Sequence, residues 1–517
     1  MPTTDRGFLA VFPQHQSSFF RLPRELRYLC YSHYLFEENG YHHVWDGCAG
    51  KLRCCNNSIV ALDLMYTCKA AANEMHGLPF QANTITFTAG DLVSEHSLCS
   101  DALRFKRLVD YATVAKWRIL LAVADTVTPD DLAKLIQRFP RTGPSFVNQF
   151  QTLRDRNFHS GPEIHRIEYN LHGKHVVASR EALEFALELA ASHPEFQQLA
   201  AKALPQSPPP KDDPLDRNVG FMRGSHCWVL DFKPEAWTVP DETQLDSLES
   251  LLWWDEEYPL NLEFDPRPFG WYFSATAMAI AFLKHLGSDR RTHIRRIIID
   301  EKDRAVSSPE VHARGLIPFC VENPRLRIER RVDLWGHVIP SRWGATADLS
   351  GLQYIQAWCL LQSLADWILE ANDLYSRGMP SNSFSLVFQG DQDQHVWNMA
   401  KEAAAFQETF VEYYRRHNSH PPPLSHQAEH QVLPWPLPWH APAEFPIAMK
   451  EIARGTSIVR TRWALDKGRD IEEMIAEHDG WPLIKWRRKW QWGIIYRKVS
   501  LPPGGAGTNS GPPSGEC

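Results

Sequence analysis

Residues at helical spacing form a stripe close to the N-terminus, made up of Leu22, Leu26, Leu29, Cys30 and His33. Pro23 fits the first turn of such a helix, because the N–H that proline lacks has no helical partner there. Glu25 is also favourable near this end, since its charge complements the helix dipole. The pattern therefore predicts a short amphipathic helix that begins near Pro23 and buries its stripe in a core.

A second helical pattern covers 59–76, and its stripe consists of Leu64, Cys68, Ala71 and Met75. Gly77 and Pro79 follow, and these residue types commonly end a helix. We predict that the two helices pack together, with one small core that contains Leu22, Leu26, Leu64 and Cys68. Replacing a fully buried Leu of that core by Ala is expected to cost about 2–5 kcal/mol.

The segment between the two helices, residues 40–55, contains Gly and Asn and is typical of a hairpin. Beyond the second helix, Ile85 and Phe87 alternate with Thr, as the residues of a half-buried strand do. We therefore expect a first unit at 19–90, which follows an N-terminal arm at 1–18.

Residues 91–204 are predicted to form a helical region. Residues 128–131 supply a Thr N-cap, a Pro at the first helical position and two acidic residues in the first turn. An amphipathic helix is expected at 179–192, before Pro194. The stretch at 205–220 is rich in Pro, which indicates a linker or a loop.

A mixed body is predicted for 221–416. The β-branched run at 294–300 is typical of a buried strand, and 326–332 predicts another. A helix that Ser308 opens between them completes a strand–helix–strand unit, which favours parallel pairing and a right-handed crossover. Further helices are expected at 241–254, 271–286, 351–375 and 393–416, and further strands at 226–232 and 384–388. This mixture indicates the α/β or α+β fold class.

The C-terminal part divides by composition. Residues 417–446 are rich in Pro and His and are predicted to be extended. The segment 447–501 carries a run of Trp and basic residues, and 502–517, mostly Gly, Pro and Ser, are expected to be disordered. We expect at least two tryptophans of the run to pack on the body, since burying Trp is favourable. An exposed tail that binds nucleic acid is the alternative. The tryptophans concerned are Trp481, Trp486, Trp490 and Trp492.

Three elements of the first unit resemble the F-box-like module of proteins from filamentous fungi, a group whose function is not characterised. The Leu-Pro-x-Glu-Leu start falls on Leu22, Pro23, Glu25 and Leu26. The element that begins Leu-x-x-Thr-Cys falls on Leu64, Thr67, Cys68 and Lys69, and the Asn-Thr-x-x-Phe strand on Asn83, Thr84 and Phe87. The resemblance covers residues 19–90 and does not extend to the rest of the chain.

The resemblance implies what this end of the molecule binds. F-box modules are small helical units that dock on the Skp adaptor of cullin-RING ubiquitin ligases. By resemblance, the protein-binding residues are Leu22, Pro23, Glu25, Leu26, Leu64 and Cys68. The expected function is that of a protein-interaction subunit that recognises an unidentified protein substrate for such a ligase. An interaction protein without a ligase role and, with less support, an enzyme of unrecognised class are the alternatives.

Motifs of known chemistry are missing from the sequence, which contains no GxSxG, Walker A, HExxH or Rossmann glycine pattern. The cysteines and histidines between Cys30 and Cys55 lack the CxxC spacing of a zinc site. No catalytic residue, cofactor or metal ligand is therefore predicted, and we expect a protein that is not an enzyme. A concave polar pocket with converging titratable groups would favour an enzyme instead.

Charge and hydropathy narrow the partners further. The net charge of −7 gives no overall basic excess, which argues against nucleic acid as a partner of the whole chain. No apolar run approaches the length of a membrane span, so no membrane association is expected. The ten cysteines are scattered without the pattern of a disulfide framework, which favours a reduced protein of the cytoplasm or nucleus.

Overall fold

The computed structural model of the chain describes residues 14, 16–45, 50–89, 95–155, 176–204, 221–222, 226–250, 252–253, 271–339, 352–390, 394–417, 441–463, 469–482, 485–486 and 494–498. The expected linker at 205–220 and the expected disordered tail at 502–517 lie outside these residues, as does most of the expected extended segment at 417–446. Trp490 and Trp492 also lie outside them.

A sheet of seven strands organises the molecule. Its strands are β1 (Tyr41–Val44), β2 (Lys51–Cys54), β3 (Thr84–Thr88), β6 (Arg296–Glu301), β7 (Arg327–Asp333), β9 (Phe384–Gln389) and β10 (Val459–Thr461). They lie in the order β10-β9-β7-β6-β3-β1-β2. Strands β1 and β2 form an antiparallel hairpin, and every other neighbouring pair is parallel. The chain therefore has the mixed helix and sheet fold that the sequence predicts.

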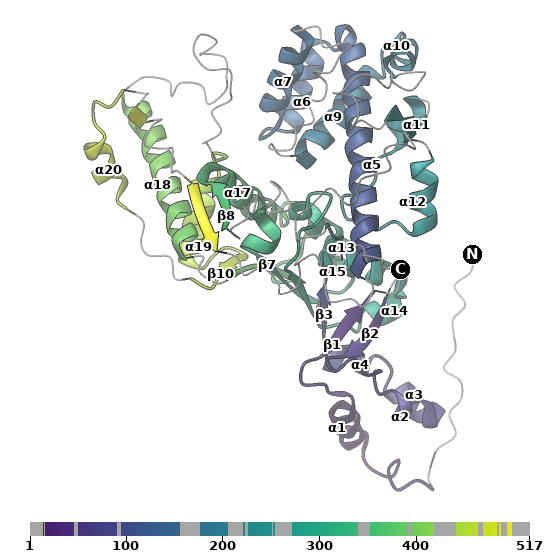
Figure 1. The fold of residues 1–517 in the computed structure, drawn as a ribbon. Coiled ribbons are helices and arrows are strands. Elements are labelled where there is room, and N and C mark those ends of the chain that lie inside the picture. The colour runs from purple at the N-terminus through teal and green to yellow at the C-terminus, as the bar shows by residue number, and fades with distance from the viewer. Residues whose placement is uncertain are drawn as a thin grey trace, which may run out of the picture.

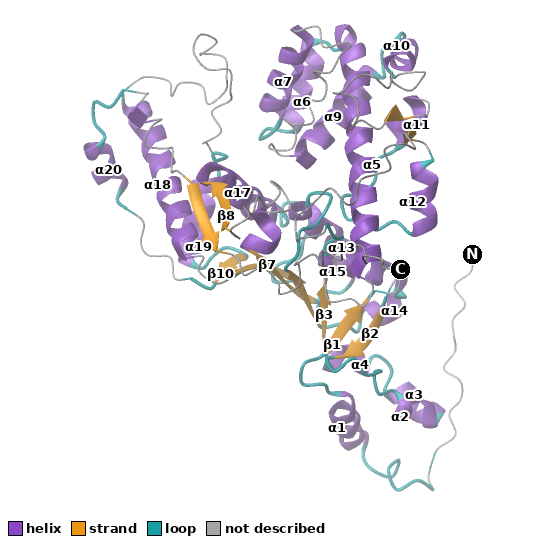
Figure 2. Cartoon of the chain, in the orientation of Figure 1, coloured by secondary structure: helices purple, strands orange, loops and turns teal. Residues whose placement is uncertain are grey.

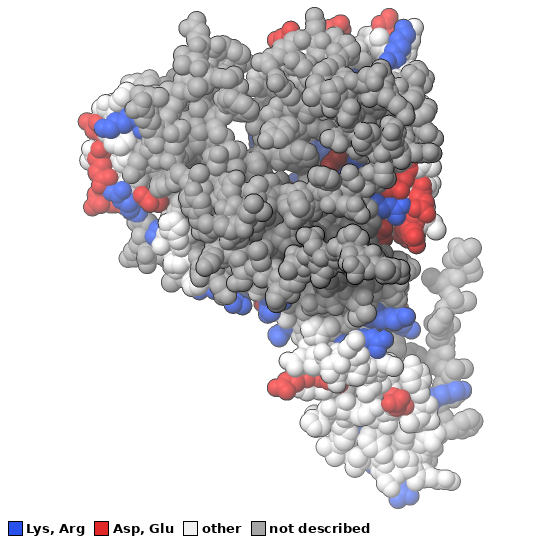
Figure 3. Space-filling view, in the orientation of Figure 1, with Lys and Arg blue, Asp and Glu red and all other residues white. Residues whose placement is uncertain are grey.

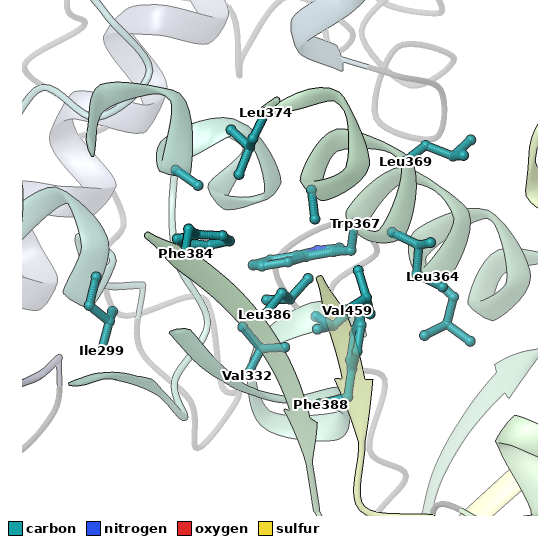
Figure 4. Packing of buried hydrophobic residues seen from close by; sticks show 14 of the residues in the cluster. Ile299, Val332, Leu364, Trp367, Leu369, Leu374, Phe384, Leu386, Phe388 and Val459 are labelled. Atoms are coloured by element: carbon teal, nitrogen blue, oxygen red, sulfur yellow. The ribbon is translucent and has the colours of Figure 1, made fainter. Parts of the chain in front are cut away.

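The sheet buries one face under helices, because apolar residues alternate along its strands. In β6, for example, Ile297 and Ile299 are buried and Ile298 is only half-buried. The buried residues of neighbouring strands join one large hydrophobic cluster with the helices that follow each strand. Figure 4 shows Trp367 of α17 (Ala357–Asp373) lying over the strands that carry Leu386 and Val459.

The predicted strand–helix–strand unit is confirmed. Strands β6 and β7 pair in parallel, with Ile297 opposite Ile328. Between them the chain forms a 3-10 helix, η3 (Pro309–Leu316), that continues into α15 (Ile317–Glu322). Ser308 precedes η3 in a left-handed conformation, and its side chain makes no capping hydrogen bond.

A block of helices packs beyond the sheet-bearing body (Figures 1 and 2). It contains α5 (Glu95–Ala122), η1 (Ala124–Thr126), α6 (Pro129–Arg138), α7 (Gly143–Asp155), α9 (Val176–Ala190), α10 (Phe196–Ala203), α11 (His226–Asp231) and α12 (Glu242–Glu249). These helices bury their own hydrophobic cluster, which Phe273 and Met278 of the body also join. The predicted start of α6 is confirmed, since Thr128 and Asp131 form a reciprocal capping box.

The other helices lie in the body and in a lobe near the N-terminus. The body contains α13 (Ala275–His285), α14 (Ser288–Arg291), η4 (Leu334–Val338), α17, α18 (Gln394–Arg416), α19 (Phe445–Arg454) and α20 (Ile471–Glu477). The lobe contains α1 (Arg24–Leu35), α2 (Asp63–Thr67), α3 (Lys69–Glu74) and α4 (Leu78–Ala82). Two short antiparallel pairs complete the structure, β4 (Phe221–Met222) with β5 (Leu252–Trp253) and β8 (Leu352–Gln356) with β11 (Ile494–Lys498).

Four predicted elements differ from the structure. The expected helix at 241–254 ends at Glu249, and Leu252–Trp253 form strand β5. The segment 226–232 is helical rather than a strand, because α11 packs on α5 and shares the core of the helical block. The expected helix at 351–375 begins instead with strand β8, and α17 starts only at Ala357. The expected helix at 59–76 is two short helices, with Cys68 in an extended conformation between them.

The prediction that at least two tryptophans of the C-terminal run pack on the body is confirmed. Trp486 is fully buried against Phe406, Phe410 and Tyr413 of α18. Trp481 is partly buried in the same cluster, with Nζ of Lys485 4.2 Å from its ring centroid. Two tryptophans of the segment therefore pack on the body. In the described part of the chain, no helix has both the length and the apolar character that crossing a bilayer requires.

Candidate protein-docking surface

The lobe of α1 to α4 projects from the sheet, beyond strands β1 and β2 (Figure 1). It has a small core of its own, which consists of Tyr31, Leu35, Ala71, Met75 and Leu78. Phe19, Phe20, Leu62, Leu64, Met65 and Cys68 are partly buried against that core. The lobe thus brings together the two helical segments that the sequence expects to meet.

An ion pair fixes α1 to α3. Nε of Arg27 donates to Glu74 at 2.9 Å, its Nη2 donates to the other carboxylate oxygen, and the Tyr31 hydroxyl donates to Glu74 at 3.1 Å. The hydrogen bond with Glu74 raises the pKa of Arg27, and the same bond lowers the pKa of Glu74. Burial raises the pKa of Tyr31, so this phenol stays a donor. The three side chains therefore set the orientation of α1.

Two of the predicted binding residues shape the backbone of the lobe. Pro23 stands just before α1, and its carbonyl accepts from the N–H groups of Leu26 and Arg27, both at 3.1 Å. Cys68 interrupts the second helix and caps α3, since its Sγ accepts from the N–H of Ala71 at 3.4 Å. Leu64 is partly buried beside it, and Glu25 is exposed in the first turn of α1.

The outer face of α1 is apolar and exposed. The exposed fractions of Leu22, Leu26 and Leu29 are 37%, 47% and 62%. The prediction that Leu22 and Leu26 share a core with Leu64 and Cys68 is therefore wrong. At about 3.6 residues per turn, Leu26 and Leu29 lie opposite the face that buries Tyr31 and Leu35, and Leu22 precedes the helix.

Other apolar residues of the lobe are exposed as well. Tyr28 and Tyr34 of α1 are exposed, as are Phe36 just after it and Tyr66 of α2. Figure 3 shows the projecting lobe as largely uncharged on the face in view. A gathered set of exposed apolar side chains marks an interaction surface more often than scattered ones do. We call the exposed set Leu22, Leu26 and Leu29 the α1 stripe.

A buried polar network lies at the carboxyl end of β6. Glu301 is fully buried and accepts from the N–H of Ala275 at 2.9 Å, from Oγ1 of Thr276 at 2.6 Å and from Nη2 of Arg330 at 2.8 Å. Burial alone would raise the pKa of Glu301, but the surrounding positive charge and hydrogen bonds lower it to about 2. Burial lowers the pKa of His337, whose imidazole therefore stays neutral beside this carboxylate.

A buried serine and histidine extend the network. Oγ of Ser274 caps α13 by accepting from the N–H of Ala277 at 2.9 Å, and it lies 2.7 Å from Nδ1 of His312. The other ring nitrogen of His312 lies 2.9 Å from the carbonyl of Ser307, so it carries the proton and the serine hydroxyl donates. Both side chains are fully buried and their polar atoms are satisfied. This geometry favours a structural role over that of a nucleophile and base.

A cavity of about 180 Å³, lined by both charged and apolar residues, lies where the helical block meets the body. Residues of both parts line it, including Arg314, Glu181 and Glu370. Arg314 bridges the other two, donating to Glu181 at 2.7 Å and to Glu370 at 2.6 Å. Because these three charged groups pair with one another, we interpret the cavity as part of the contact that joins the helical block to the body.

The cysteines and histidines of the first unit do not converge. Cys30 and Cys55 are exposed, Cys54 is buried, and His43 packs on the ring of Phe87. Among the described residues, no group of His, Cys, Asp and Glu has the arrangement of a metal site. Cys48 lies outside the described residues.

The residues that orient the lobe were missed in the sequence, namely Arg27, Tyr31, Leu35 and Glu74. Their signal was present, because Arg27, Tyr31 and Leu35 recur every four residues and form a second possible stripe.

Comparison with known proteins gives no assignment: no family model matches the chain, and no curated protein or solved structure matches it significantly.

Proposed function

We propose that the α1 stripe is the docking site of a partner protein, and that the partner is the Skp adaptor of cullin-RING ubiquitin ligases. The chain would then act as a substrate-recognition subunit, with the sheet-bearing body and the helical block available to bind the substrate. This assignment places the chain in the cytoplasm or the nucleus, where such ligases work. It requires no catalytic group of the chain itself.

The observation that supports docking is the orientation of α1. Tyr31 and Leu35 are buried in the core of the lobe, whereas Leu22, Leu26 and Leu29 are exposed to solvent. Leaving two leucines of α1 and the nearby Leu22 exposed loses the free energy that their burial would supply. A partner that covers them regains it. The link from docking to the adaptor in particular rests on the resemblance of Leu22, Pro23, Glu25 and Leu26 to the F-box-like start.

The test is binding of the full chain to a purified complex of the Skp adaptor with the N-terminal domain of its cullin, measured by biolayer interferometry. Leu26→Asp and Leu29→Asp place a charge on the α1 stripe, and each is expected to weaken binding at least about tenfold, which corresponds to about 1.4 kcal/mol. Ile447→Asp is the matched control, because Ile447 of α19 is exposed to 62%, the same fraction as Leu29. This control is expected to bind as the unchanged chain does.

Three outcomes are informative. Binding that is lost in the two stripe variants and kept in the control supports the proposal. Binding that survives both stripe substitutions contradicts the role of the α1 stripe. If the adaptor does not bind, the ligase role is refuted, and proteins captured from a lysate by the unchanged chain and not by Leu29→Asp would identify a different partner for the same surface.

A further inference from the structure

Four arginines gather at the amino end of two neighbouring strands. Arg296 and Arg327 are the first residues of β6 and β7. Arg295 directly precedes β6, and Arg325 lies two residues before β7. Because β6 and β7 pair in parallel, their amino ends lie side by side, and the two strands are about 4.8 Å apart. Figure 3 shows basic side chains along the lower border of the body, next to the projecting lobe. We call these four residues the arginine rim.

Like charges face each other within the rim. Arg296 stands directly opposite Arg327 in the register of β6 and β7, and like charges in such positions destabilise a sheet. Burial and the charge of Arg325 both lower the pKa of Arg295. Among the described residues, none of the four guanidinium groups forms an ion pair with a carboxylate. The described residues therefore leave this concentration of positive charge without a paired carboxylate.

Two of the four side chains are held in place by hydrogen bonds to backbone carbonyls just before them in the chain. Nη1 of Arg295 donates to the carbonyls of Thr292 at 2.8 Å and Ile294 at 3.2 Å, three residues and one residue before it. Nη1 of Arg327 donates to the carbonyls three residues and one residue before it, at 2.7 and 2.8 Å. These bonds leave Nε and Nη2 of each guanidinium without a partner in the described part of the chain. Donors that are already oriented lose less entropy when they bind.

We propose that the arginine rim binds an anionic segment of a partner protein, through the oxygen atoms of a phosphorylated side chain or of clustered carboxylates. Arginine suits this role because its planar fork of N–H donors matches phosphate and carboxylate oxygens in pairs. A bound oxyanion would also relieve the repulsion between Arg296 and Arg327. This inference does not depend on the partner of the α1 stripe, because it uses different residues and a different chemistry.

The surroundings of the rim favour a peptide over a nucleic acid. Glu329 lies two residues beyond Arg327 on the same face of the sheet, and the carboxylate of Glu322 is already paired with Arg291. Asp289 of α14 adds a further negative charge shortly before β6 in the chain. A nucleic acid carries a charge at every nucleotide and needs a longer basic track than this one. One or two oxyanions of a peptide fit the short positive edge between these acids.

The probes are three degenerate libraries of short fluorescent peptides, whose centres carry phosphoserine, a cluster of Asp and Glu, or serine. Binding of each library to the full chain is followed by fluorescence anisotropy at low and at physiological salt. We expect one or both anionic libraries to bind at least about tenfold more tightly than the serine library. Their affinity should fall as salt rises, because salt screens exposed charges. The better of the two anionic libraries distinguishes phosphate from carboxylate as the recognised group.

Charge reversal at Arg296 and Arg327, made together as R296E/R327E, is expected to abolish the preference for the anionic library. Both side chains are exposed, so the variant should keep the melting curve of the unchanged chain. The matched control is K202E/R454E, which changes the net charge equally at two exposed residues of α10 and α19. It should bind as the unchanged chain does.

The proposal is overturned if all three libraries bind alike, or if the rim variant keeps its preference. A single-stranded RNA of matched charge serves as a fourth probe. If the unchanged chain binds this RNA more tightly than either anionic library and the rim variant loses that binding, the rim is a nucleic-acid site and the peptide proposal fails. None of these outcomes affects the adaptor test, because the α1 stripe is unchanged in both double variants.

Discussion

Replacing Glu301 by Gln tests which interaction holds the centre of the sheet together. Glu301 and Arg330 are exposed to only 0% and 1%, and Nη2 of Arg330 lies 2.8 Å from Oε1 of Glu301. Gln keeps the shape of the side chain and can still accept from the N–H of Ala275. It cannot supply the negative charge, and Arg330 cannot lose its proton to compensate. The variant therefore leaves a buried cation without the carboxylate that it contacts.

The magnitude follows from the burial of both groups. Removing one partner of a buried ion pair costs about 3–5 kcal/mol, mostly because the remaining charge is desolvated and unpaired. We expect Glu301→Gln to lower the free energy of unfolding by that amount. Removing both charges, in Glu301→Gln with Arg330→Met, should cost much less than the two single changes added together, since no isolated charge remains.

The assay is urea-induced unfolding followed by tryptophan fluorescence. Trp367 is a suitable reporter, because the guanidinium carbon of Arg330 lies 4.5 Å from its ring centroid. Circular dichroism run in parallel shows whether both signals report one transition. A Glu301→Gln variant within about 1 kcal/mol of the unchanged chain would refute the reasoning, as would a double variant whose loss equals the sum of the single losses.

The remaining predictions concern the lobe, its junction and the buried histidine. Leu35→Ala should destabilise the lobe by about 2–5 kcal/mol, whereas Leu29→Ala should change the melting curve little, as hydrogen exchange of the lobe can show. Gly77→Ala should cost about 1–3 kcal/mol in urea unfolding, because Gly77 has φ of +73° and a Cβ there would lie 2.2 Å from the His293 ring. Burial and the charge of Arg330 lower the pKa of His312 from 6.5 to about 3. The contribution of this residue to stability should therefore be complete above pH 6.5 and be lost as the pH falls towards 3. His312→Gln should reduce this dependence of the unfolding free energy on pH.

Local patterns in the sequence were sufficient for the central strands. The run at 294–300 contains four isoleucines, which favour a buried strand, and the pairing of β6 with β7 follows from the helix between them. The helix start at Thr128 and Asp131 could also be predicted from the sequence, because its capping hydrogen bonds join residues three positions apart. Such features depend on neighbours in the chain and need no knowledge of the fold.

The orientation of α1 could not be obtained in this way. Two stripes of comparable apolar character run along the helix, one through Leu26 and Leu29 and the other through Tyr31 and Leu35. Periodicity ranks the leucine stripe first, because it scores hydrophobicity and ignores hydrogen bonds. The structure buries the other stripe, since Arg27 and Tyr31 both bind Glu74, which is 47 residues from Arg27 in the chain. A polar contact between distant residues thus decides which face is exposed.

The relation between the N-terminal unit and the body was also beyond local patterns. Composition suggests a boundary near residue 90, yet β3 pairs with β6 in parallel, with Ile85 opposite Ile297. The strands of the first unit therefore extend the sheet of the body, and only the helical lobe projects from it. No sequence pattern links residues more than two hundred positions apart. Which strands pair with each other is decided only when the whole sheet assembles.

This shared sheet has a consequence for the two proposed contacts. Asn83, just before β3, donates to the carbonyl of Leu35 at 2.8 Å and accepts from the N–H of Glu37 at 2.8 Å, which ties the end of α1 to the sheet. The amide of Gln81 lies 2.9 Å from the ring of His293, which precedes Arg295 and Arg296. The α1 stripe and the arginine rim are therefore linked through β3 and β6 rather than through a flexible connection. A partner on α1 and an anionic segment at the rim would be held at a fixed separation, which is the arrangement that a protein bridging two partners requires.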